Sequence, residues 1–153
     1  MLPVAQTSVS LDTNPLLAFE GNLSHTEGRR IRFAAADLYK NGQLCEAEML
    51  TRAALQHYPD NEDVLIIRAL ICEVTHDWSA AASALALLVK LQGPNAPVEA
   101  WSHWVRVLRC DGQYNAALEA VLQGLQLHPA HPKLASELAQ LEALAASPQP
   151  KAA

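Results

Sequence analysis

The chain has 153 residues, 50% of them hydrophobic, and a formal net charge of −5 at pH 7. This length fits one domain, and the apolar share is enough to bury a core. The acidic balance gives no general affinity for nucleic acid or for an anionic membrane surface, so we expect neither as a partner.

Residues 1–27 show no sustained hydrophobic periodicity and are expected to form a partly disordered N-terminal arm. The first residues contain no Lys or Arg and precede no long apolar run, so we expect no signal peptide. No stretch approaches the roughly 18 apolar residues of a membrane span. An apolar island at residues 15–19 has two interpretations. It stays disordered with the arm, or it forms a short helix capped by Asn14 that packs on the following domain or enters a groove in it.

After the arm, apolar residues recur at helical spacing, and helix-breaking residues divide the pattern into seven helices. Asn41 and Gly42 end the first helix, because glycine adopts the left-handed conformation of a C-cap without a steric penalty. Residues 92–97 (QGPNAP) predict a longer loop and no domain boundary, since the same pattern resumes beyond them. The Pro-containing tail at residues 147–153 is expected to be disordered. The predicted helices span residues 29–40, 44–57, 63–75, 78–91, 98–110, 114–127 and 133–146.

The predicted helices form pairs that repeat along the chain. Pro59 and Pro129 are 70 residues apart, and Ala81 lies 34 residues after Ala47 and 36 before Ala117. A helix–turn–helix unit of about 34 residues is the signature of one class of repeat protein. The pattern resembles the tetratricopeptide repeat (TPR) family, which has small or apolar residues at repeat positions 4, 7, 8, 11, 20, 24 and 27 and Pro at position 32. The resemblance covers about two thirds of the chain.

The TPR resemblance implies an all-α fold, an α-solenoid of three repeats closed by a C-terminal capping helix. The middle copy departs from the family pattern in three places. Arg68 replaces an apolar residue, Leu88 replaces a small one, and Pro94 falls one residue late. The implied repeats span about residues 28–61, 62–97 and 98–131, and the capping helix spans residues 132–146.

No motif in the sequence predicts chemistry. Cys45, Cys72 and Cys110 are widely spaced, which predicts reduced, mostly buried thiols in a reducing compartment, the cytoplasm. The six histidines are scattered, and no set of three or four metal ligands converges. A glycine-rich phosphate loop, GxSxG and HExxH are all missing from the sequence. We therefore expect no cofactor, no metal and no enzymatic activity.

Two further pairs of residues have a structural interpretation. The TPR resemblance places Trp101 and Trp104 at packing positions, so we expect them in the core and not in a binding platform. Glu46 and Glu48 stand near the start of a helix, where carboxylates favour the positive end of the helix dipole.

The first helix of each pair carries most of the positive charge, with seven of the eleven Lys and Arg. In TPR proteins these helices line a concave groove through repeat positions 2, 5, 9, 12 and 13, and arginine suits the carboxylates or carbonyls of a peptide. A solvated charged face is the alternative interpretation. Ala36 stands where a carboxylate clamp needs Asn, so we predict no such clamp. The candidate partner-binding residues are Arg29, Arg32, Tyr39, Lys40, Ile66, Leu70, Glu73, Ser102, Arg106 and Arg109.

The sequence supports two hypotheses for function. The first is an adaptor or chaperone that binds an extended peptide or helix of a partner protein in the groove, in a layout similar to small chaperones of bacterial type III secretion systems. The second is an assembly or regulatory subunit, for example of a bacterial secretion or envelope machine, that acts through the convex face and oligomerises. The two hypotheses differ in which surface is apolar and exposed.

Overall fold

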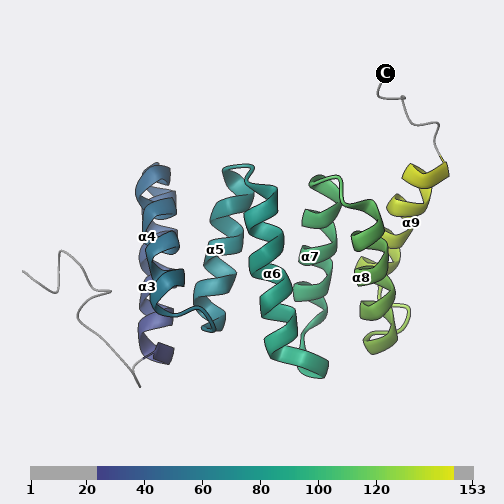
Figure 1. The fold of residues 1–153 in the computed structure, drawn as a ribbon, viewed down its shortest axis with the longest axis horizontal. Coiled ribbons are helices and arrows are strands. Elements are labelled where there is room, and N and C mark those ends of the chain that lie inside the picture. Colours follow the sequence, from purple (N-terminus) through teal and green to yellow (C-terminus); the bar gives the residue numbers. More distant parts are fainter. Residues whose placement is uncertain (1–23, 147–153) are drawn as a thin grey trace, which may run out of the picture. The chain divides into compact units, whose positions relative to one another are not determined.

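The structure is a computed structural model and describes residues 24–146. Within this range the chain is all α, with one short 3-10 helix and no strand (Figure 1), as predicted. The elements are α3 (Ser24–Lys40), α4 (Leu44–His57), α5 (Glu62–Val74), α6 (Trp78–Gln92), η2 (Gly93–Asn95), α7 (Val98–Cys110), α8 (Tyr114–Leu127) and α9 (Pro132–Ala146).

The observed helices follow the predicted ones closely, with one difference. Helix α3 begins at Ser24, five residues before the predicted start at Arg29. The other boundaries agree to within one residue, and the predicted loop at residues 92–97 contains η2. The candidate helix at residues 15–19 lies outside the described residues. No helix among residues 24–146 is long and apolar enough to cross a membrane.

The turn inside each helix pair needs a backbone conformation that suits glycine. Gly42 has a φ of 79° and Gly112 a φ of 78°, and the equivalent residue of the middle copy, His76, has a φ of 62°. These residues are 34 and 36 apart, like the buried alanines of the repeat. Their left-handed conformation turns the chain back so that the second helix of each pair can begin.

The chain divides into two compact units between Ile71 and Cys72, inside α5. In the first unit, α3, α4 and most of α5 share two clusters of buried residues. Ala47 and Ala54 of α4 are fully buried, as expected where two helices cross closely. The clusters contain Ile31, Ala54, Tyr58 and Val64 in one case, and Ala35, Ala47, Ile67 and Ile71 in the other.

Arg68 in the first unit explains one departure from the family pattern. Its side chain is buried and donates to Oε2 of Glu48 at 2.8 Å and to the Thr51 hydroxyl at 3.2 Å. Glu48 also accepts a hydrogen bond from Arg52 at 2.8 Å. The expectation that Glu48 serves only the helix dipole is therefore wrong, because its carboxylate neutralises a buried guanidinium across two helices.

The pKa of Glu48 reflects this position. Burial raises the pKa of the Glu48 carboxyl, but the hydrogen bonds from Arg68 and Arg52, with their positive charges, outweigh burial and hold the pKa below its ordinary value. Glu27 of α3 shows the opposite balance. Burial raises the pKa of the Glu27 carboxyl, and the nearby charge of Arg30 only partly compensates.

In the second unit, α6, α7, α8 and α9 follow one another as neighbouring helices (Figure 1). Ala81 and Ala117, at the same repeat position, are fully buried. A Cβ atom added to Gly124 would lie 3.1 Å from Leu134 and 3.3 Å from Trp101, so α7, α8 and α9 meet closely there. Helix α9 packs on both α7 and α8, as a capping helix does.

The cysteines differ from the prediction of mostly buried thiols. Cys72 is buried, whereas Cys45 and Cys110 are exposed. Cys45 is the second residue of α4 and Cys110 is the last residue of α7, and neither belongs to the buried residues of its helix. Among the described residues no cluster of three His, Cys, Asp or Glu side chains is arranged to hold a metal ion.

Candidate functional site

In the second unit, Glu73 and Arg106, two of the residues that the sequence singled out, form an ion pair. The Oε2 atom of Glu73 accepts a hydrogen bond from Nη2 of Arg106 at 2.7 Å. Its Oε1 atom lies 2.7 Å from Nε2 of His103, on the same side of α7. Glu73 therefore fixes the position of the Arg106 guanidinium, whose side chain is 45% exposed. A guanidinium has five N–H donors, so Arg106 retains donors for a further acceptor.

Beside Arg106 lies a cavity of about 400 Å³ between α7 and α9, called here the α7–α9 pocket. Its lining contains two cations, two hydroxyl groups and one carboxylate, and the Ser102 hydroxyl donates to the Glu99 carbonyl at 3.3 Å. Such a set suits the carboxylate groups of a ligand, because charge-assisted hydrogen bonds to carboxylates are the stronger ones. The lining residues are Ser102, Arg106, Pro132, Lys133, Ser136 and Glu137.

The sequence predicted only two residues of this pocket, Ser102 and Arg106. It missed the contribution of α9, which we expected only to cap the repeats. Yet the repeat pattern contains the signal: counting on from Pro129 at repeat position 32, Lys133 and Ser136 fall at positions 2 and 5 of an incomplete fourth repeat. These are positions that line the groove in the TPR family.

Arg109 has a different place from Arg106. Its Nε atom donates to Oε1 of Glu137 at 3.1 Å, and the two side chains are 22% and 12% exposed. This ion pair ties α7 to α9 and leaves Arg109 less accessible to a ligand. Lys133 lies at the rim, 3.8 Å from Glu99, and both of those side chains are exposed.

The candidate residues of the first unit form a separate set. Arg32 of α3 donates to Asp63 of α5 at 2.9 Å, so this arginine is also paired. Arg29, Tyr39 and Lys40 are exposed on α3. On α5, Ile66 is half-buried and Leu70 is exposed.

Ion pairs within the chain limit how freely the candidate arginines can bind a partner. The sequence suggested guanidinium groups open to a partner, but Arg32, Arg106 and Arg109 each have a carboxylate partner. These carboxylates come from helices distant in sequence, which is why spacing alone did not reveal them. Of the three arginines, Arg106 combines the highest exposure with a neighbouring pocket.

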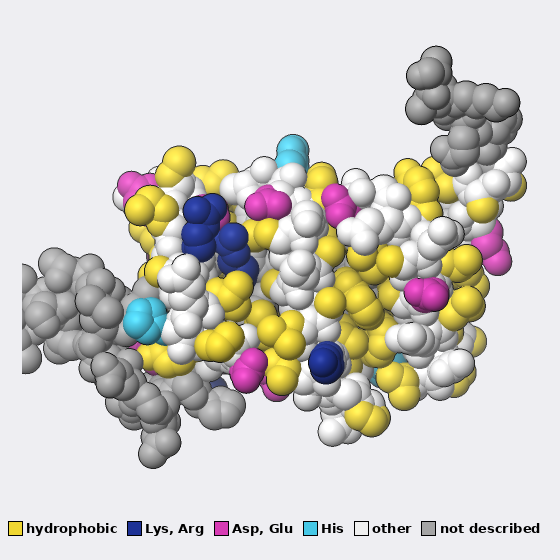
Figure 2. All heavy atoms as spheres, viewed as in Figure 1, with side chains coloured by type: hydrophobic (Ala, Val, Ile, Leu, Met, Phe, Trp, Pro, Cys, Tyr) yellow, Lys and Arg dark blue, Asp and Glu magenta, His cyan; other side chains and the backbone are white. Residues whose placement is uncertain are grey.

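Helix α8 presents the most prominent apolar surface of the second unit. Tyr114, Leu118 and Leu122 follow one another at a spacing of four residues and are 37–48% exposed, so they form one stripe, called here the α8 stripe. Hydrophobic side chains are also conspicuous on the face of α6 and α8 that Figure 2 shows. The α8 stripe lies on the second helix of its pair. The convex-face hypothesis assigns the interaction surface to these second helices.

The sequence matches no protein-family model and no curated protein. Several solved TPR domains have the same fold. One is the first TPR domain of Spaghetti (RPAP3) bound to the HSP90 peptide SRMEEVD, with a TM-score of 0.67 and 19% identity over 80% of this chain and 96% of that one. Another is the second TPR domain of human RPAP3 in complex with the HSP70 peptide SGPTIEEVD, with a TM-score of 0.65 and 16% identity over 78% of this chain and 98% of that one.

A third similar structure is the TPR domain of Sgt2 from Aspergillus fumigatus. Its TM-score is 0.64, with 18% identity over 83% of this chain and 88% of that one. At these identities the likeness concerns the fold. The chain is therefore an all-α repeat protein with the TPR fold, as its sequence pattern predicted.

Proposed function

We propose that the chain is a protein-interaction module, an adaptor or chaperone, that binds an acidic segment of a partner protein at the α7–α9 pocket. The observation that carries the proposal is the position of Arg106. Its guanidinium is held by Glu73 and remains 45% exposed beside a pocket of about 400 Å³. Lys133 and Ser136 line the same pocket, so a carboxylate meets two cations and one hydroxyl donor there, while the Ser102 hydroxyl donates to the Glu99 carbonyl at 3.3 Å.

The similar structures support an acidic ligand. The two RPAP3 domains are described with the peptides SRMEEVD and SGPTIEEVD, both rich in carboxylates. In this chain Ala36 stands where a carboxylate clamp needs Asn, so the proposal rests on the second unit and not on a clamp in α3. The candidate residues of the first unit are proposed as a separate contact surface, with Tyr39 and Leu70 available to apolar side chains.

Binding of the labelled peptide SRMEEVD, followed by fluorescence anisotropy, tests the proposal. Arg106→Gln should weaken binding about tenfold, which corresponds to ~1.4 kcal/mol. Arg52→Gln is the matched control, because Arg52 is also an exposed arginine with one glutamate partner but lies on α4. An amide-substituted peptide, SRMQQVN, in which Gln replaces Glu and Asn replaces Asp, should bind more weakly than the acidic one. Equal binding of both peptides, or an effect of Arg52→Gln but not of Arg106→Gln, would contradict the proposal.

The α8 stripe favours a second candidate function, the assembly subunit that acts through its convex face. Exposed leucines at a spacing of four suit contact with another helix. Sedimentation velocity of the chain and of the double variant Leu118→Ser, Leu122→Ser distinguishes the two. A dimer or larger oligomer that the double variant abolishes would support assembly through α8, whereas a monomer in both cases would leave the α7–α9 pocket as the functional site.

A further inference from the structure

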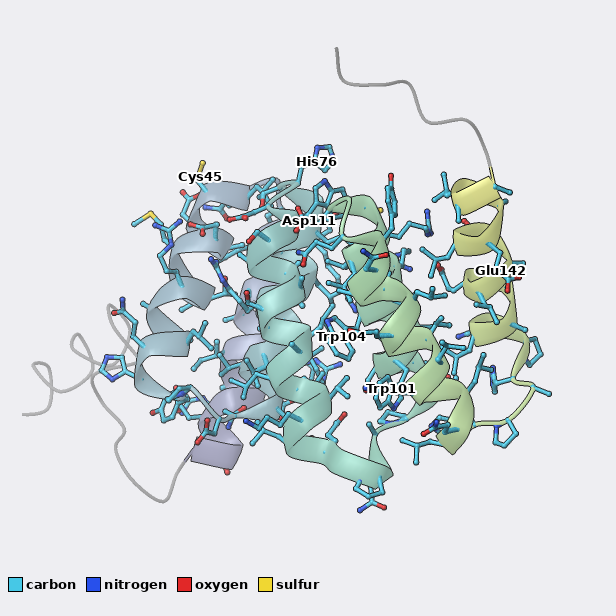
Figure 3. The ribbon with its side chains drawn as sticks, turned by 45° about the vertical axis from the view of Figure 1, so that its right-hand side comes forward. Cys45, His76, Trp101, Trp104, Asp111 and Glu142 are labelled. Carbon is cyan, nitrogen blue, oxygen red and sulfur yellow. The ribbon has the colours of Figure 1, made fainter. Side chains whose placement is uncertain are left out.

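A second cavity lies on the other side of α7, between α6 and α8, and has a volume of about 320 Å³. We call it the α6–α8 pocket. Its lining is almost entirely apolar, apart from Lys90 and Gln123. In Figure 3, Trp101 and Trp104 lie between the ribbons of α6 and α8. The other lining residues are Ala86, Val89, Gly93, Pro94 and Leu127.

The irregular spacing of the repeats builds one end of this pocket. The loop after α6 contains the two additional residues that separate the 34-residue and 36-residue spacings, and its 3-10 turn contributes Gly93 and Pro94 to the wall. Gly93 has a φ of 57°, which turns the chain away from the axis of α6. Nε2 of His128, just after α8, donates to the Ala96 carbonyl at 3.0 Å and holds the loop in place.

The two tryptophans that line the pocket carry hydrogen-bond donors without an acceptor among the described residues. Their rings are 5.8 Å apart, and Trp101 is 5% exposed. The Nε1 atoms of both rings are shielded from solvent and have no acceptor among residues 24–146. A buried donor without an acceptor costs free energy, and tryptophan N–H groups usually find a partner when they are buried. Water reaches neither Nε1 atom, so an occupant's oxygen recovers that hydrogen bond only after the indole ring turns toward the pocket.

Lys90 supplies a positive charge at the mouth. It is exposed and is the basic residue of the last turn of α6. Figure 2 shows a lone basic side chain over the C-terminal end of α6, with hydrophobic side chains around it. Leu127 lines the same mouth and is 42% exposed, so the pocket opens to solvent. An open apolar pocket covers one side of its occupant, which suits a side chain whose backbone stays outside.

We propose that the α6–α8 pocket binds a partner protein through one apolar side chain, with a carboxylate of the same segment against Lys90. The side chain fills the apolar lining, and the carboxylate meets the ammonium group. A backbone carbonyl of the segment accepts from an indole N–H once that ring turns toward the pocket. This site is distinct from the α7–α9 pocket, because the two share no lining residue. A negative result for the α6–α8 pocket therefore does not contradict the function proposed for the α7–α9 pocket, and the reverse also holds.

N-acetyl-leucine is a minimal probe, since it carries an isobutyl side chain, an amide carbonyl and a carboxylate. Proton–nitrogen NMR of the full chain separates the indole signals of its three tryptophans, which Trp78→Phe and Trp104→Phe variants assign. Trp78 stacks on His76 and does not line the pocket, so its signal is an internal reference. We expect N-acetyl-leucine to shift the Trp101 and Trp104 signals saturably and to leave Trp78 in place.

Two comparisons sharpen the test. N-acetyl-leucine amide lacks the carboxylate and should bind about two- to fivefold more weakly, the range of an exposed ion pair. Lys90→Gln should remove this difference, and Lys90→Arg should keep it. Ala86→Met should fill the pocket and abolish the shifts, whereas Ala139→Met on the exposed side of α9 should not.

Three results would overturn the proposal. The first is the absence of a saturable shift in the wild-type chain, and the second is an equal response of all three indole signals. The third is binding of octanoate at these signals without binding of N-acetyl-leucine, which would assign the pocket to free aliphatic acids. Because Lys90 is exposed, its variants keep the fold and remain informative even if Ala86→Met does not fold.

Discussion

Arg68 occupies a repeat position that usually holds an apolar side chain, and Glu48 neutralises it at 2.8 Å. The arginine itself is visible in the sequence as an irregularity, but its partner is not. Glu48 lies 20 residues earlier on another helix, and several carboxylates precede Arg68 at helical positions. Only the packing of α4 on its neighbours shows which of them meets the guanidinium.

The two members of this pair should respond differently to removal. Glu48→Ala leaves a buried guanidinium without its carboxylate and should lower the free energy of unfolding by about 3–5 kcal/mol. Arg68→Met restores an apolar residue and leaves Glu48 paired with Arg52, so its cost should be smaller, roughly 1 kcal/mol. Urea denaturation of both variants and of the double variant measures this. A larger loss from Arg68→Met than from Glu48→Ala would contradict it.

The acids Glu48 and Glu27 should give the first unit opposite responses to pH. The pKa of Glu48 is lowered in the folded chain, so its contribution is present above the ordinary value of 4.5 and disappears as pH falls through the folded pKa. Glu48→Gln should therefore destabilise most near neutral pH. The pKa of Glu27 is raised by burial, so its charged form costs stability above the folded pKa.

Glu27→Gln should accordingly stabilise the chain near pH 7, and the gain should vanish as pH falls below the ordinary value of 4.5. Thermal unfolding of the wild-type chain and both glutamine variants between pH 3 and 7 tests the two signs together. Variants that shift the melting temperature in the same direction at pH 7 would contradict this account.

At the scale of the helix, the helix-breaking residues in the sequence placed every helix boundary to within one residue except the start of α3. Gly42 and Gly112 provide the left-handed turn residues, and His76 takes the same conformation in the middle copy. These signals are local, so they can be read without the fold. The start of α3 was missed because Ser24–Gly28 have little apolar periodicity, although Gly28 lies so close to Asn61 that a Cβ atom there would overlap it.

The buried alanine of the repeat gives a prediction about helix packing. Ala117 of α8 is fully buried, so Ala117→Leu should force the helices apart and lower the free energy of unfolding by roughly 1–3 kcal/mol. Ala139→Leu on the exposed side of α9 is the control and should change stability by less than about 0.5 kcal/mol. Chemical denaturation of both variants compares them, and an unchanged midpoint for Ala117→Leu would argue against close packing at this position.

At the scale of the molecule, the sequence was informative about the fold and less so about the site. The repeat spacing recurs along the chain, so each of the three copies supports the helix assignment made from the other two. The candidate site depends instead on which side chains meet. The register pointed to Glu73, Ser102 and Arg106, but the ion pair between Glu73 and Arg106, the contribution of Glu137 and the role of α9 emerge only when the helices pack. The α6–α8 pocket likewise follows from the irregular junction of two repeats, which the regular pattern does not describe.

The central claim is that the α7–α9 pocket receives the carboxylates of an acidic partner segment. Backbone amide NMR of the full chain, titrated with the peptide SRMEEVD, tests it most directly because it locates the contact. The account predicts that the largest shifts cluster at Ser102, Arg106, Lys133 and Ser136 and weaken as salt is added, since salt screens exposed charges. Shifts confined to the α8 stripe, or no saturable shift at all, would contradict the account.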